Sequence, residues 1–242
     1  MSVSYSCQRP CVAASWSRRF AFLAAAFLCA SAALASDALI PLSLRDVQVG
    51  GEIGRRIAIT ITNNLLVLDA DGAFLQPFRV RTAKDGYIGL GKLIDATVKF
   101  AAQSGDARVL VLKQHLVAET LKTQESDGYI GIMAPPYRVW GLWDTHELGY
   151  IIWGLLTDYR YFGEERSLAA ARKAADYLIQ HWPSMPANWG KDSDVEPHVA
   201  FTGLERTMLA LGRQTGAASY RDFVVQTRQL PEWDLPIFFV RM

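Results

Sequence analysis

The chain has 242 residues, of which 50% are hydrophobic, and its 25 basic and 24 acidic side chains give a net charge of +1. This length supports one sizeable hydrophobic core and is short for several domains. The near-neutral charge argues against a nucleic-acid partner, because such a partner selects a strongly basic surface.

The first 35 residues have the pattern of a signal peptide. Arg18 and Arg19 precede an apolar run from Phe20 to Ala35, which ends in the small residues that signal peptidase cleaves. We therefore expect residues 1–35 to be removed and the protein to be secreted or periplasmic. No later segment approaches the roughly 18 apolar residues of a transmembrane helix, so no membrane span is expected after signal removal.

All three cysteines, Cys7, Cys11 and Cys29, lie inside this predicted signal peptide. Its removal leaves a chain without thiols, which excludes disulfides, zinc-thiolate sites and cysteine nucleophiles from the mature protein. It also removes three arginines and no acids, which leaves 22 basic and 24 acidic side chains. A net charge near −2 further disfavours nucleic-acid binding.

The next segment, residues 36–90, gives an ambiguous pattern. Ile57, Ile59 and Ile61 alternate with polar residues as in a strand, whereas the leucines after Asn64 could form short helical turns. Both interpretations stay open. We expect this segment to be irregular and to pack on a helical domain that occupies residues 91–242.

Three glycine-bearing turns divide the rest of the chain into helical hairpins. The turn glycines are Gly105, Gly163 and Gly216, which lie 58 and 53 residues apart. On both sides of each turn, apolar residues recur at intervals of three and four, the period of an amphipathic helix. One pair of helices is expected on either side of Gly105. The other four expected helices are residues 144–162, 165–182, 197–214 and 218–229.

These hairpins predict an all-α fold that forms about half of an (α/α)6 toroid. One hairpin cannot bury both of its faces, but stacked hairpins can, as a ring around a funnel or as an open solenoid. The chain ends in the apolar run Ile237 to Val240 with no later partner, so we expect a domain that is truncated at its C-terminus. A solenoid capped by a partner protein is the alternative.

The sequence DGYIG occurs twice, at Asp85–Gly89 and Asp127–Gly131. Asp followed by Gly is first a turn signal. A functional interpretation of the second copy is that it brings Tyr129 to the mouth of the funnel. The loop after it is rich in aromatic residues, whose faces stack on sugars.

The segment from Trp143 to Tyr150 is the strongest candidate for a binding site. In a helix that begins at Asp144, His146 and Tyr150 share a face and could hydrogen-bond a hydroxylated ligand. Asp144 and Glu147 have the spacing of a capping box, which is a structural role and favoured over catalysis. We predict that His146, Tyr150, Trp143 and Tyr129 bind substrate.

The loop at residues 192–198 contains Asp192, Asp194, Glu196 and His198. No pair of them has the spacing of a zincin and no companion ligands are visible, so solvated loop charges explain them better than a metal site. No metal site is predicted.

An ordered series of motifs spans about Ile40 to Arg228: GGEIGRR near Gly50, NNLLVLD from Asn63, PFRV from Pro77, GLGKLIDA from Gly89, DGYIG at Asp127, WDTHELGYIIWGLLTDYRYFG from Trp143 and GLERTMLALGRQTG from Gly203. This series resembles the catalytic domain of the β-L-arabinofuranosidase family, glycoside hydrolase family 127.

This resemblance implies a ring of six helical hairpins followed by β-sandwich domains. It also implies retaining removal of terminal arabinofuranose by a zinc-bound cysteine thiolate and a glutamate acid/base, unlike the usual two-carboxylate plan. The segment that should hold those residues is not matched here, so catalytic residues stay unknown and no cofactor is expected in this chain. Only His146 is carried over, as a sugar-contacting residue.

The leading hypothesis is a secreted glycoside hydrolase-like protein that acts on terminal furanose sugars of glycans, incomplete and inactive as this chain alone. A non-catalytic glycan-binding or partner-capped helical protein is the alternative. A third possibility, a toroidal polysaccharide lyase, requires a tyrosine or histidine base opposed to an arginine. His146 with Tyr150 could supply part of that arrangement.

Overall fold

The computed structural model describes residues 42–141, 143–184 and 203–227. Its contacts divide the chain into the units Met1–Leu42 and Ser43–Met242. Apart from Leu42, the first unit lies outside the described residues, so the signal peptide stays a prediction, as do the domain boundaries. Within the described ranges the second unit is helical, and its only β pairing is an isolated bridge between Ala83 and Met133.

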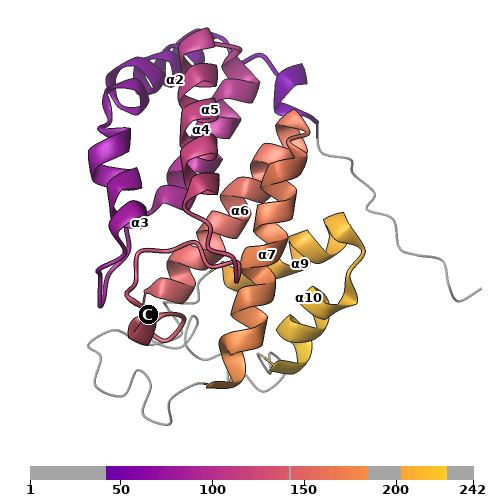
Figure 1. Cartoon of the computed structure of the whole chain (residues 1–242). Coiled ribbons are helices and arrows are strands. Elements are labelled where there is room, and N and C mark those ends of the chain that lie inside the picture. The colour runs from indigo at the N-terminus through magenta and orange to yellow at the C-terminus, as the bar shows by residue number, and fades with distance from the viewer. Residues whose placement is uncertain (1–41, 142, 185–202, 228–242) are drawn as a thin grey trace, which may run out of the picture. The chain divides into compact units, whose positions relative to one another are not determined.

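Three helical hairpins follow one another along the chain, as predicted (Figure 1). Their periodic apolar residues form the buried faces. The six helices are α4 (Leu90–Ser104), α5 (Ala107–Lys122), α6 (Asp144–Phe162), α7 (Glu165–His181), α9 (Leu204–Thr215) and α10 (Ala218–Asp222), and α10 continues as a π-helical turn, Phe223–Thr227.

The turn glycines end the first helix of each hairpin by adopting a left-handed conformation. Gly105, Gly163 and Gly216 have φ values of 64°, 69° and 73°, and each donates its N–H to a carbonyl of the last helical turn. A side chain is strained at such φ values, whereas glycine is not. The regularly spaced glycines therefore mark the same kind of helix C-terminus in all three hairpins.

The first helices of successive hairpins pack against one another, and each second helix packs on the first helix of its own hairpin. α6 contacts both α4 and α9, while α5, α7 and α10 each pack on the helix that precedes them. In Figure 1, α7 lies in front of α6. This alternation of an inner and an outer helix confirms the predicted partial (α/α)6 toroid.

The segment before the first hairpin is more regular than predicted. Helix α2 spans Gly51–Asn63 and helix α3 spans Gln76–Val80, with a π-helical turn, Ala70–Leu75, between them. The strand interpretation of the isoleucines was wrong, because Ile61 is buried in α2 while Ile59 is exposed, as a helix requires.

A buried ion pair joins the first two hairpins. Lys113 of α5 donates to Asp158 of α6 at 2.7 Å, and Ser167 of α7 donates to the other carboxylate oxygen at 2.6 Å. The ammonium also lies 4.3 Å from the centre of the Phe162 ring. Because both carboxylate oxygens have partners, the charge is tolerated in the core, and removal of one partner would leave an uncompensated buried charge.

Helices α4 and α6 approach so closely that only glycine fits between them. A Cβ atom built on Gly91 would lie 2.1 Å from the carbonyl carbon of Tyr150 and 2.3 Å from the nitrogen of Ile151. A Cβ on Gly154 would lie 2.6 Å from the carbonyl oxygen of Gly91. These are backbone atoms, which cannot move aside as a flexible side chain can.

We predict that Gly91→Ala lowers the free energy of unfolding by about 1–3 kcal/mol, because the added methyl group overpacks the α4–α6 contact. Gly149→Ala in α6 is the matched control, since its Cβ would meet only Leu204 at an ordinary 3.5 Å. That control should be neutral or stabilising by up to about 1 kcal/mol through helix propensity. Urea unfolding of the three proteins gives the values, and equal stability of Gly91→Ala and wild type would contradict the prediction.

Candidate functional site

The start of α4 is held by a carboxylate from α6. Oε2 of Glu147 accepts the backbone N–H groups of Ile88 at 2.6 Å and Gly89 at 2.7 Å, directly before the first residue of α4. An anion at a helix N-terminus is stabilised by the helix dipole and by the otherwise unpaired amides. The other oxygen, Oε1, is buried without a hydrogen-bond partner among the described residues.

The predicted capping box was wrong. Helix α6 has no side-chain cap hydrogen bond, and its N-cap residue is Trp143 rather than Asp144. Glu147 instead caps the neighbouring helix α4, as described above. Asp144 accepts hydrogen bonds from the Tyr129 hydroxyl at 2.8 Å and from the N–H of Val139 at 2.6 Å.

The Asp144 contacts fix a strained loop in front of α6. Val139 has a φ of 65°, which is unfavourable for a β-branched residue. Asp144 binds its N–H, and the hydroxyl of Thr145 donates to its carbonyl at 2.6 Å. The first turn of α6 thus binds both the N–H and the carbonyl of Val139. A strained backbone conformation is retained where the surrounding contacts fix it in this way.

Lys92 and His146 meet where α4 and α6 begin. The Lys92 ammonium lies 2.9 Å from Nε2 of His146. An ammonium group can only donate, so Nε2 of His146 is the acceptor in this contact. The His146 side chain is 8% exposed, which places it at the edge of the core and not deep within it.

Three aromatic rings surround this pair. The ring centres of Tyr87, Tyr150 and Trp143 lie 4.9, 4.9 and 5.5 Å from the His146 ring. The Lys92 ammonium also lies 4.6 Å from the Tyr87 ring centre and 4.5 Å from that of Tyr150, at cation–π distance. Tyr87 is 43% exposed, so the group borders solvent. We call these five residues the Lys92–His146 cluster.

Tyr129 does not belong to this cluster, although it was predicted beside the other three. It is 0% exposed, its hydroxyl donates to Asp144, and the same oxygen accepts the N–H of Met133 at 3.0 Å. Burial, with the negative charge of Asp144, raises the pKa of the Tyr129 phenol. The side chain therefore supports the loop before α6.

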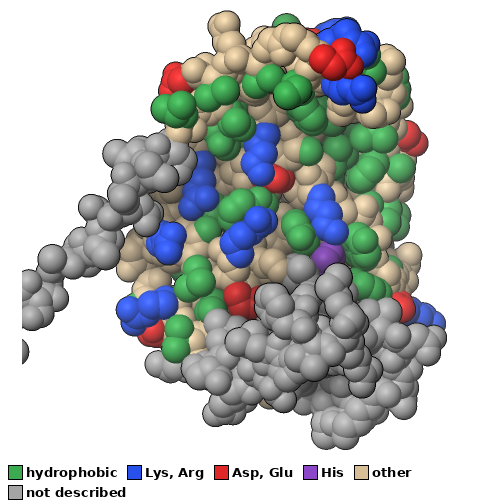
Figure 2. Space-filling model, turned by 180° about the vertical axis from the view of Figure 1, so that it is seen from behind, with side chains coloured by type: hydrophobic (Ala, Val, Ile, Leu, Met, Phe, Trp, Pro, Cys, Tyr) green, Lys and Arg blue, Asp and Glu red, His purple; other side chains and the backbone are tan. Residues whose placement is uncertain are grey.

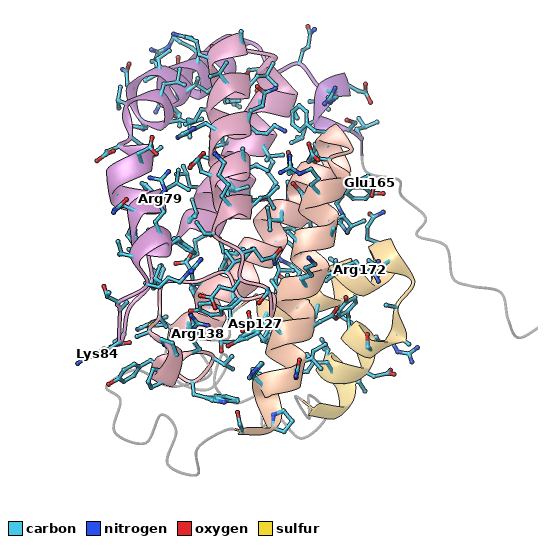
Figure 3. The ribbon with its side chains drawn as sticks, in the orientation of Figure 1. Arg79, Lys84, Asp127, Arg138, Glu165 and Arg172 are labelled. Atoms are coloured by element: carbon cyan, nitrogen blue, oxygen red, sulfur yellow. The ribbon has the colours of Figure 1, made fainter. Side chains whose placement is uncertain are left out.

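The loop around Tyr129 is stabilised by charge pairs. Arg138 binds both carboxylate oxygens of Glu125 at 2.8 Å, and its guanidinium lies 4.1 Å from the Tyr129 ring centre. Arg81 reaches the same carboxylate at 2.9 Å. Figure 3 shows Arg138 and Asp127 in this loop region; Asp127 accepts the N–H of Tyr129 at 3.0 Å. The second DGYIG copy thus forms a structural turn.

Sequence reasoning missed two members of the cluster, Tyr87 and Lys92. Tyr87 lies in the first DGYIG copy, which was interpreted as a turn, and Lys92 lies in the GLGKLIDA motif. Only the packing of α4 on α6 brings them to His146. The acidic loop at residues 192–198 lies outside the described residues.

The described residues contain neither a metal site nor a membrane span. No group of three or more His, Cys, Asp or Glu side chains in the described ranges is placed to hold a metal ion. Of the helices that the structure describes, none has both the length and the apolar character needed to cross a bilayer.

The model of the β-L-arabinofuranosidase GH127 catalytic domain matches residues 74–228. The chain belongs to the GH127 family. The match contains the Lys92–His146 cluster and all three hairpins, so the sequence resemblance is confirmed, and the protein is glycoside hydrolase-like. No curated protein sequence matches the chain.

Solved structures of GH127 enzymes share the fold. A GH127 β-arabinofuranosidase is 17% identical with a TM-score of 0.58, over 76% of this chain and 33% of that one. The GH127 β-L-arabinofuranosidase of Geobacillus stearothermophilus T6 is 19% identical with a TM-score of 0.54, over 74% and 32%. The chain thus spans about a third of the length of these GH127 structures.

Burial gives Asp144 an unusual protonation equilibrium. Desolvation raises the pKa of its carboxyl to about 7, against the hydrogen bonds from Val139 and Tyr129, which favour the charged form. Burial also raises the pKa of Glu147. Both acids then bind protons more tightly in the folded protein than in the unfolded chain.

We predict that the contribution of Asp144 and Glu147 to the stability of the folded protein is fully present near pH 4 and declines as the pH rises toward 7. An acid with a raised folded-state pKa contributes stability below its unfolded pKa and loses it up to the folded pKa, by at most about 1.4 kcal/mol per pH unit and group. Asp144→Asn should make this decline shallower, with Glu147 responsible for the remainder. Chemical unfolding from pH 4 to 8 measures it, and identical slopes for both proteins would refute the assignment to Asp144.

Proposed function

We propose that this chain forms the part of a secreted GH127 glycoside hydrolase that binds the terminal furanose sugar, and that the Lys92–His146 cluster is where the sugar binds. The single observation that carries the proposal is the Lys92–His146 hydrogen bond of 2.9 Å inside three aromatic rings. Aromatic rings stack on the C–H faces of sugars, while the nitrogens contact hydroxyls.

Each member of the cluster has a role that follows from its position. Lys92 has three N–H donors, and one is directed to His146, which leaves two for sugar hydroxyls. Tyr87, with 43% of its surface exposed, supplies the outer ring against which a sugar would stack. Tyr150 and Trp143 fix the imidazole between them. Tyr129 has no binding role in this proposal because it is fully buried.

The proposal is limited to binding by this chain. The resemblance to GH127 enzymes implies a zinc-bound cysteine thiolate, but the described residues include no cysteine and no group of side chains placed to hold a metal ion. The implied zinc site therefore does not fit these residues. We propose that the chain by itself binds the sugar without hydrolysing it, and that residues 1–35 direct its export to the periplasm or the outside.

Arabinofuranose is the proposed sugar because the GH127 structures that share the fold are β-arabinofuranosidases. The family match over residues 74–228 supports a carbohydrate ligand in general. The alternative is a glycan-binding protein that is not part of an enzyme. It would bind the sugar at the same cluster, so the two hypotheses differ in whether the sugar is hydrolysed and agree on where it binds.

We predict that the full chain binds methyl β-L-arabinofuranoside and that His146→Ala weakens this binding at least about tenfold, which corresponds to about 1.4 kcal/mol. Isothermal titration calorimetry measures affinity, and thermal unfolding checks that the variant keeps its fold. His115→Ala is the matched control, because His115 pairs with Asp71 on an exposed surface of α5. Unchanged affinity in His146→Ala, or equal loss in both variants, would refute the proposal.

A further inference from the structure

The side of α6 that carries the cluster continues into a second group of aromatic and basic residues. Trp153 follows Tyr150 by three residues and therefore lies on the same side of the helix. The guanidinium of Arg206, from α9, lies over the Trp153 ring, 4.0 Å from its centre. Tyr150 also reaches α9, because a Cβ at Gly203 would lie 3.4 Å from its hydroxyl oxygen. The two groups are thus neighbours.

Two further cations face the same indole ring. Lys99 of α4 and Arg160 of α6 lie 5.9 and 5.8 Å from the Trp153 ring centre. Lys99 is paired with Asp95 at 2.7 Å. Arg160 donates to the carbonyl of Ala210 at 3.3 Å, and neither it nor Arg206 forms an ion pair within the described part of the chain.

Among the described residues, this face carries more positive than negative charge. Seen from behind, on the side away from α7, Lys and Arg side chains spread across the middle of the surface with few acidic side chains among them (Figure 2). Burial, together with the nearby positive charge of Arg213, lowers the pKa of Arg160. Excess positive charge of this kind attracts anions.

The geometry at Arg206 suits one type of anion. A guanidinium that lies over an indole ring has fewer orientations open to it, and its N–H donors can bind a carboxylate through two parallel hydrogen bonds. The Nε1 donor of Trp153 is also buried without a partner among the described residues. Arginine and indole donors thus occur together, beside the proposed sugar site.

We propose that Trp153, Arg160 and Arg206 form a subsite for a carboxylate-bearing sugar, so that the glycan bound by this chain carries a uronate next to its terminal furanose. This inference rests on the proposed function, because the Lys92–His146 cluster would hold the terminal sugar. The inference specifies the class of glycan that binds, which is acidic and not neutral. The carboxylate would bind the guanidinium of Arg206, with Arg160 as the second positive charge.

The test compares two disaccharides that differ only in the carboxylate: β-L-arabinofuranosyl-galacturonate and β-L-arabinofuranosyl-galactose. Calorimetry with the full chain at low salt should give the uronate at least about tenfold higher affinity, and added salt should reduce this ratio by screening. Arg206→Gln should bring the ratio close to one. Arg206→Lys, which keeps the charge and loses the planar fork, should give an intermediate ratio.

Arg166→Gln is the matched control, since Arg166 is an exposed residue of the outer helix α7 and its loss changes the net charge equally. It should leave the ratio unchanged. Equal affinity for the two disaccharides, or the same loss of the ratio in Arg166→Gln, would overturn the uronate subsite alone. Failure to bind either disaccharide would overturn the proposed function as well.

Discussion

The contact between the backbones of α4 and α6 is the constraint on which this structure depends. Gly91 lies against Tyr150 and Ile151 so closely that a methyl group would overlap backbone atoms. That approach places Lys92, the next residue, within 2.9 Å of His146. It also lets Glu147 bind the two amides in front of α4. The same α4–α6 contact therefore packs the core and assembles the candidate site.

The helical hairpins could be predicted from the sequence because their signals are local. Apolar residues at three- and four-residue intervals and glycines with left-handed φ angles mark each helix and its end, and α6 and the turn at Gly163 match the prediction. The segment around Ile57 could not be assigned, because three alternating isoleucines fit a strand as well as a helix. The helix is selected by tertiary packing, which a local sequence pattern does not show.

The candidate site was predictable only in part, for the same reason. His146, Tyr150 and Trp143 lie within one turn or two of a single helix, so their proximity follows from helix geometry. Tyr87 and Tyr129 occur in identical DGYIG sequences, yet the first borders solvent beside His146 and the second is 0% exposed. Identical local sequence gives two roles because different helices pack against the two loops.

Membership of the GH127 family, a helical half-ring and an aromatic cluster around Lys92 and His146 together support a carbohydrate ligand. A crystal structure of the chain with methyl β-L-arabinofuranoside tests this account most directly. The account predicts a sugar stacked on Tyr87, with its hydroxyls within hydrogen-bond distance of the Lys92 ammonium. A sugar bound elsewhere, or a Lys92 ammonium separated from the His146 ring, would contradict it.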